Sequence, residues 1–222
     1  MFICKTGNYH LQNGSNNQDY GFVQDIGILN RKRKCVCDGC GSGENSEVGA
    51  KLFCNIYSKP NVHTIEYAMS KVMDNFYSFK TQSYISSDVK NFACFTILSV
   101  TETEKHFVVQ YCGDGYIIKH NHDNTIEFEE LTDGENPKYL AYNYLDPQHL
   151  THYKDGVEIT AKMYLKPAFL NIGVATDGIR DIIGSSMEDE FVEYLKSGKE
   201  SAIKRLINRN QKHIHDDVTI AM

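Results

Sequence analysis

Apolar positions recur along the chain with two different periods, and each period indicates one kind of element. Short runs of β-branched and aromatic residues, or apolar residues at every second position, predict strands. Apolar residues at helical spacing predict helices at 46–57, 65–79, 187–196 and 200–210. The predicted strands lie at 2–5, 20–29, 33–37, 92–100, 106–111, 116–119, 126–128, 157–163, 169–175 and 218–222.

The order of these elements predicts the fold class. Strands come first, then two helices, more strands, two further helices and a last strand. Such an order is typical of an α+β protein, and we expect a four-layer αββα sandwich with two antiparallel sheets flanked by helix pairs. We expect the strand at 116–119 to form a hairpin with 106–111, segment 7–19 to be a loop, and 132–164 to be largely irregular.

Length and composition are those of an ordinary globular protein. The 222 residues include no linker rich in proline, serine or glycine, so we expect one domain over 1–222. The longest apolar runs are far too short to cross a bilayer, and no secretory signal is visible, which predicts a cytoplasmic protein that does not bind membranes. The net charge of −6 argues against a nucleic acid partner.

The seven cysteines are scattered over predicted strands and helices. This odd number, without the density of a disulfide scaffold, suits a reducing compartment. Cys35, Cys37 and Cys40 do form a cluster, but a zinc site needs a fourth ligand, and Cys40 lies beyond the turn that ends the strand. We favour small buried apolar residues over a zinc site here.

The stretch from 35 to 50 is the one around which the chemistry is organised. A strand ends on Asp38, glycines follow at 39, 41 and 43, and a helix begins near Ser46. Gly39 has no Cβ, so a ligand can approach the main chain and its carbonyl oxygen can be offered to a cation. Taken alone, an Asp-Gly pair such as Asp38-Gly39 is more often a hairpin turn than a ligand site.

Other carboxylates share this position at the tip of a strand. Asp114 and Asp177 follow apolar strands, whereas Asp19 and Asp216 precede strands. If these side chains and Asp38 meet at one end of the sheets, their mutual repulsion requires cations. Oxygen ligands with few histidines favour magnesium, manganese or calcium over zinc.

Five separated motifs together resemble the metal-dependent protein serine/threonine phosphatases of type 2C, the PPM family. The resemblance extends from one end of the chain to the other, as in a compact bacterial member with no added domain. The motifs are Asn17-Gln18-Asp19, residues 36–43 with 47–50, Gly113-Asp114-Gly115, Ala175-Thr176-Asp177-Gly178 and Asp216-Asp217-Val218-Thr219.

The resemblance implies roles for individual residues. Asp38 would bridge two manganese or magnesium ions, Asp177 and Asp216 would complete the first site, and these three aspartates would be the catalytic residues. The carbonyl of Gly39 and an acidic contact from Asp19 would serve the second ion. Asp114 would hold a third, weaker ion together with Asp177. A water bridging the two main ions would be the nucleophile.

The chain departs from the family pattern at several positions. Gly14 stands where members commonly have an arginine that grips the substrate phosphate, and His10 is the candidate substrate-binding residue that would compensate. Gln18 stands where some members have glutamate, so either Asp19 supplies the acidic contact or the second metal site is weaker. Cys40 replaces a histidine that could protonate the leaving group, and a thiol is a poor acid for this task.

The resemblance implies hydrolysis of phosphoserine and phosphothreonine in proteins. The partners would be a phosphorylated protein and a cognate serine/threonine kinase, and we expect a monomer. A second hypothesis is a degenerate member that binds a phosphorylated partner without turning it over, as the missing arginine suggests. A third is a domain whose acidic strand tips are merely solvated.

Overall fold

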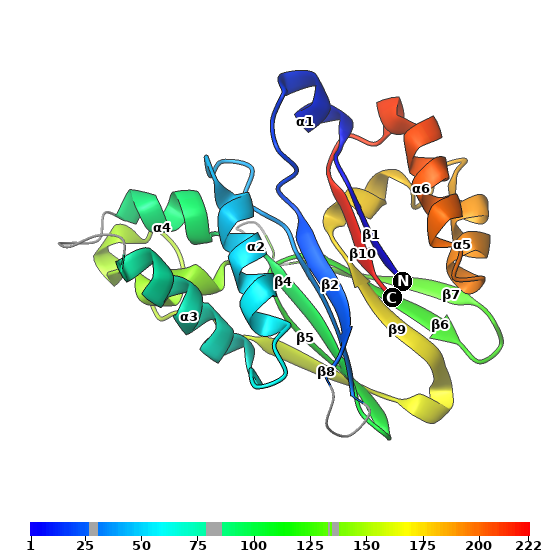
Figure 1. Cartoon of the computed structure of the whole chain (residues 1–222), viewed down its shortest axis with the longest axis horizontal. Helices are drawn as coiled ribbons and strands as arrows, with labels where there is room; N and C mark the ends of the chain where they lie inside the picture. Colours follow the sequence, from blue (N-terminus) through cyan, green and yellow to red (C-terminus); the bar gives the residue numbers. More distant parts are fainter. Residues whose placement is uncertain (27–30, 79–85, 133, 135–137) are drawn as a thin grey trace.

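Two five-stranded antiparallel sheets pack face to face at the centre of the molecule (Figure 1). The computed structural model describes residues 1–26, 31–78, 86–132, 134 and 138–222. The first sheet has the order β1 (Phe2–Lys5), β10 (Val218–Ala221), β9 (Phe169–Ala175), β6 (Gly115–Asn121) and β7 (Ile126–Leu131). The second has the order β2 (Tyr20–Asp25), β3 (Lys32–Cys37), β4 (Ile97–Glu102), β5 (His106–Cys112) and β8 (Thr160–Leu165).

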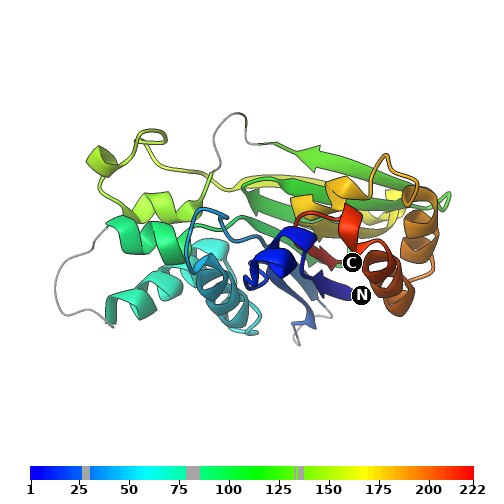
Figure 2. The same ribbon diagram turned by 90° about the horizontal axis from the view of Figure 1, so that it is seen from above.

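Helices cover the outer face of each sheet, on opposite sides of the molecule (Figure 2). The second sheet is covered by α2 (Ser46–Tyr57), α3 (Ile65–Ser78) and α4 (Ser86–Ala93). The first sheet is covered by the pair α5 (Glu188–Lys196) and α6 (Glu200–Arg209). The predicted αββα sandwich is therefore confirmed.

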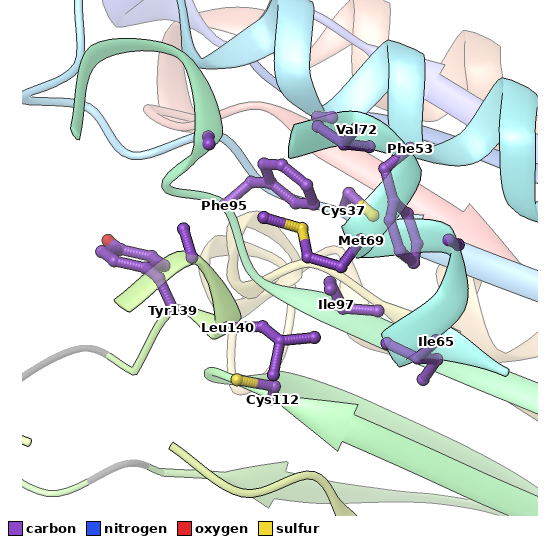
Figure 3. Packing of buried hydrophobic residues seen from close by; sticks show 14 of the residues in the cluster. Cys37, Phe53, Ile65, Met69, Val72, Phe95, Ile97, Cys112, Tyr139 and Leu140 are labelled. Carbon is purple, nitrogen blue, oxygen red and sulfur yellow. The ribbon is translucent and has the colours of Figure 1, made fainter. Parts of the chain in front are cut away.

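The described residues form three apolar layers, one between the sheets and one under each group of helices. Strand β3 contributes to two of them, because successive side chains on a strand point to opposite faces. Val36 packs between the sheets, whereas Cys35 and Cys37 face α2. In Figure 3, Cys37 lies among side chains such as Phe53 of α2 and Met69 of α3. A strand buried on both faces holds whatever follows it firmly in place.

Short elements connect the layers near their ends. Helix α1 (Asn8–Asn13) lies beside the loop before β10. The 3-10 segments are Leu140–Tyr144, Pro147–His149, Lys166–Ala168, Asp177–Asp181 and Gln211–His213. The described part of segment 132–164 thus has two short helical turns and most of strand β8, which begins and ends slightly later than the predicted 157–163.

Three sequence-based expectations need correction. Segment 7–19 contains α1, because the amides of Asn8 and Tyr9 donate to the carbonyls of Ile214 and His215, contacts that local composition does not reveal. Segment 92–100 begins as the end of α4 and becomes strand β4 only at Ile97. The predicted strand end at 27–29 and the helix end at 79 lie outside the described residues.

The third correction concerns the turn that carries Asp114. Strands β5 and β6 do not pair with each other; they belong to different sheets. The chain crosses between the sheets at Gly113 and Gly115, whose φ angles of 106° and 132° are costly for any residue with a Cβ. Asp114 is therefore placed where the two sheets meet.

No described helix has the length and apolar character needed to cross a membrane.

Candidate active site

Strand register brings the distant aspartates to one end of the two sheets. Tyr20 pairs with Cys37 across β2 and β3, so Asp19 and Asp38 follow next to each other beyond the ladder. In the first sheet, Ala175 pairs with both Tyr116 and Ile220. The segments that carry Asp114, Asp177 and Asp216 therefore leave their strands side by side.

These segments surround a cavity of about 290 Å³. Its lining includes Asp38, Gly39, Asp114, Asp177 and Asp216, and also the candidate substrate-binding residue His10. The other lining residues are Tyr9, Gln18, Cys40, Gly41, Thr96 and Tyr139. Of the sequence-predicted site residues, Asp19 is the one that does not line this cavity; it lies buried behind Asp38, 1% exposed.

Burial and mutual repulsion act on the carboxyl groups in the same direction. Burial raises the pKa of Asp38 well above its ordinary value, and the charges of Asp19, Asp177 and Asp216 raise it further. Burial likewise raises the pKa of Asp177, with Asp216 and Asp114 as the next contributors. The cavity thus penalises the negative charge of its own side chains, and a bound cation would relieve this penalty.

Among the residues that the structure describes, two buried carboxylate oxygens have no hydrogen-bond partner. They are Oδ1 of Asp19 and Oδ1 of Asp177. The other oxygen of Asp19, Oδ2, accepts a hydrogen bond of 2.6 Å from the hydroxyl of Thr176. Orphaned carboxylate oxygens in an acidic cavity and directly behind it are the ligands that hard divalent ions prefer, so these residues fit magnesium or manganese.

The carboxylates are grouped but not closely packed. Within the described ranges, no three of them place one oxygen each within 4.8 Å of one another.

Sequence reasoning missed the residue that ties the site together, Asp217. Its Oδ1 accepts a hydrogen bond of 2.7 Å from the amide of Gly7, and its Oδ2 accepts one of 2.6 Å from the amide of Gln18. Nδ1 of His10 lies 2.9 Å from Oδ1, although it is not aligned for a hydrogen bond. One buried carboxylate therefore joins the start of α1, the segment before β2 and the loop of Asp216.

The Asp216-Asp217 pair in the sequence already indicated that one of the two aspartates is buried. The pair directly precedes a strand, and successive side chains in extended backbone point in different directions. Asp216 is exposed, whereas Asp217 is 2% exposed. Only the folded structure shows which backbone amides donate hydrogen bonds to the buried Asp217.

The structure gives Gly39 a packing role. A Cβ there would lie 2.5 Å from the hydroxyl of Ser46 and 2.9 Å from the carbonyl oxygen of Gln18. The amide side chain of Gln18 donates to Ser46 and to the carbonyl of Gly43, at 3.3 and 3.4 Å. Gln18 thus braces the glycine loop, which leaves Asp19 as the acidic member of its motif.

Gly14 lies outside the acidic cavity. It ends α1 in a left-handed conformation with φ of 66° and lines a neighbouring cavity of about 400 Å³. An arginine at Gly14 would therefore strain the backbone. Nearer the aspartates, the guanidinium of Arg180 lies 3.9 Å from Asp177 and 2.9 Å from Glu130.

Comparisons with known proteins agree with this architecture. The family model of protein phosphatase 2C matches residues 6–214. The serine/threonine phosphatase Stp1 from Staphylococcus aureus superposes with a TM-score of 0.66 at 15% identity, covering 100% of this chain and 92% of that one. No curated protein sequence matches the chain significantly.

Two further solved structures show the same fold. The Mycobacterium tuberculosis serine/threonine phosphatase PstP/Ppp gives a TM-score of 0.61 at 14% identity, with 100% and 95% of the two chains covered. The catalytic domain of PstP in complex with two manganese ions gives 0.59 at 15% identity, with the same coverage. Because the family model spans nearly the whole chain, the protein belongs to the protein phosphatase 2C family.

The raised pKa of Asp38 predicts how the stability of the metal-free protein changes with pH. A group whose pKa is higher in the folded state than its ordinary 3.8 adds stability below that value, and this stability is lost as pH rises through the raised pKa. We expect the free energy of unfolding, measured with urea in chelator, to fall as pH rises above about 4. In Asp38→Asn, this fall should be smaller, and stability at pH 7 should exceed wild type by about 1 kcal/mol.

The matched control is Asp25→Asn, an exposed aspartate at the far end of β2. It should follow the wild-type pH dependence. Equal curves for wild type and Asp38→Asn would show that the cavity does not penalise the Asp38 charge.

Proposed function

We propose that this protein hydrolyses phosphoserine and phosphothreonine esters in proteins with the aid of two divalent ions, manganese or magnesium. The observation that carries the proposal is the convergence of Asp38, Asp114, Asp177 and Asp216 on one cavity, with unpartnered buried oxygens on Asp19 and Asp177. Membership of the protein phosphatase 2C family and the manganese complex of PstP support it.

In this proposal different aspartates bind different ions. Asp38, Asp177 and Asp216 are the main ligands, joined by Asp19 and the carbonyl of Gly39, and Asp114 shares a third, weaker site with Asp177. When bound, divalent ions would supply an acidified water as nucleophile and would neutralise the phosphate and the leaving oxygen.

The protein's own residues keep this cavity in shape. The amide of Asp38 donates to the hydroxyl of Thr96 at 3.1 Å, and the amide of Thr96 donates to the carbonyl of Asp38 at 2.8 Å. This reciprocal pair fixes the backbone on which Asp38 stands. Asp217 fixes the start of α1 and the segment before β2, because it accepts hydrogen bonds from the amides of Gly7 and Gln18.

His10 is the proposed contact to the substrate phosphate. Its ring is 8% exposed and lines the cavity, and Nδ1 is beside Asp217. The pairing with Asp217 leaves Nε2, on the other side of the ring, to bind a phosphate oxygen. We further propose that the substrate is a phosphoprotein made by a serine/threonine kinase, and that the phosphatase is a single-domain cytoplasmic monomer.

Phosphate release from an aryl phosphate and from a phosphothreonine peptide tests the proposed reaction. Wild type should turn over both with manganese and neither in chelator. Asp38→Asn and Asp216→Asn should each lower kcat/KM by at least about a hundredfold, or roughly 2.7 kcal/mol, because each removes a charged ligand. Asp25→Asn is the control and should match wild type.

Two results would contradict the proposal. Undiminished phosphatase activity in Asp38→Asn would show that Asp38 is not a catalytic metal ligand. Tight binding of phosphopeptide by wild type without any turnover in manganese would favour the non-catalytic phosphoprotein binder.

The role of His10 is tested by His10→Gln. Losing a charge-assisted contact to phosphate costs roughly 1.5–3 kcal/mol, so KM for the phosphopeptide should rise about tenfold to a hundredfold. Because a phosphate contact leaves the metal ligands intact, manganese affinity should stay at the wild-type value. The exposed His63 provides the control His63→Gln. A change in manganese affinity with unchanged KM would show that His10 only positions Asp217.

A further inference from the structure

Three cysteine sulfurs meet in the core behind the acidic cavity. Cys35 and Cys37 lie two residues apart on β3 and face α2, which contributes Cys54. The three sulfurs all lie within 4.8 Å of one another, and Sγ of Cys54 is 3.7 Å from Sγ of Cys37. All three residues are at most 1% exposed. Cys54 replaces Cys40 as the third member of the cluster considered from sequence.

A buried positive charge lies on the same face of β3. Arg33 is 4% exposed, donates from Nη1 to the carbonyls of Tyr57 and Val62, and stacks over the Tyr57 ring at 4.2 Å. Its Nε is buried without a hydrogen-bond partner, and no ion pair of Arg33 occurs in the part of the chain that the structure describes. A cation in a dry core is costly unless an anion lies nearby.

The cysteine cluster can supply that anion. Burial alone would raise the pKa of Cys35, but hydrogen bonds with Cys37 and Cys54 and the charge of Arg33 together lower it. Cys35 is therefore the sulfur best suited to be a thiolate, with two further sulfurs beside it. Thiolate sulfur is a soft ligand and binds soft metal ions strongly.

We propose that Cys35, Cys37 and Cys54 form a binding site for a soft monovalent metal ion, best matched by Cu(I). On binding, all three thiols release their protons to solvent, because the thiolate is the form of cysteine that ligates a metal, and the metal keeps its oxidation state. The Cu(I) ion and the Arg33 guanidinium then offset two of the three thiolate charges in the buried site.

Coordination number separates Cu(I) from zinc. Structural zinc is held by four ligands in a tetrahedron. Within the described residues no fourth cysteine, histidine or carboxylate joins the three sulfurs, and the surrounding side chains include Phe53. A three-sulfur site buried among apolar side chains suits an ion that accepts three ligands.

The test uses the full-length protein under anaerobic, reducing conditions. Because the sulfurs are buried, Cu(I) is offered both to native protein and during refolding from denaturant, and excess is removed with a competing chelator. We expect one Cu(I) to be retained per chain, with sulfur as its only neighbour in X-ray absorption. Retention of zinc instead, nitrogen or oxygen neighbours, or no retained copper in either arm would overturn the site.

Variants assign the retained ion to this cluster. Cys54→Ala and the volume-filling Cys54→Val should each weaken Cu(I) retention by at least about tenfold, as should Arg33→Met. The matched control is Cys94→Ala, since Cys94 is buried in the same apolar cluster outside the three sulfurs. Equal retention by wild type and both Cys54 variants would contradict the proposal. So would a wild-type mass lower by two hydrogens after copper exposure, which marks a disulfide.

Discussion

Repulsion among carboxylates at one end of the two sheets is the constraint on which the site depends. The charge of Asp216 raises the pKa of both Asp38 and Asp177, that of Asp177 adds to the effect on Asp38, and Asp19 adds a buried charge behind them. Left to themselves, such groups would move apart or take up protons. The strands that carry them must therefore be held by contacts made elsewhere in the molecule.

Those contacts come from the core on one side and from Asp217 on the other. Strand β3 is buried on both faces, so Asp38 emerges from a rigid support. Asp217 gathers Gly7, His10 and Gln18, which lie close to one another near the other end of the sequence, around a single carboxylate. The core thus holds Asp38 in place, and the contacts of Asp217 hold the residues on the side of α1.

The sequence was enough to predict the layers and most of the aspartate cluster. Periodicity identified most of the strands and the helices α2, α3, α5 and α6, but not α4. The motifs identified Asp38, Asp114, Asp177 and Asp216 as partners. It did not predict α1, whose first amides bond to the carbonyls of Ile214 and His215, or the passage of Asp114 between sheets. These features depend on contacts between segments far apart in the chain, which local patterns do not carry.

The roles of individual polar residues were harder to predict for the same reason. Composition does not distinguish Asp216, which lines the cavity, from its buried neighbour Asp217. Nor does it reveal that Gln18 braces the glycine loop through Ser46, or that Gly14 ends α1 in a left-handed conformation. Each role follows from where neighbouring backbone groups point after folding.

A crystal structure of the protein soaked in manganese, with the ions located by anomalous scattering, would show whether the aspartates share metal ions. We expect two manganese ions in the cavity, with oxygens of Asp38, Asp177 and Asp216 at bonding distances of roughly 2.0–2.6 Å. Manganese bound elsewhere, or these three side chains each more than about 6 Å from a shared ion, would contradict this expectation.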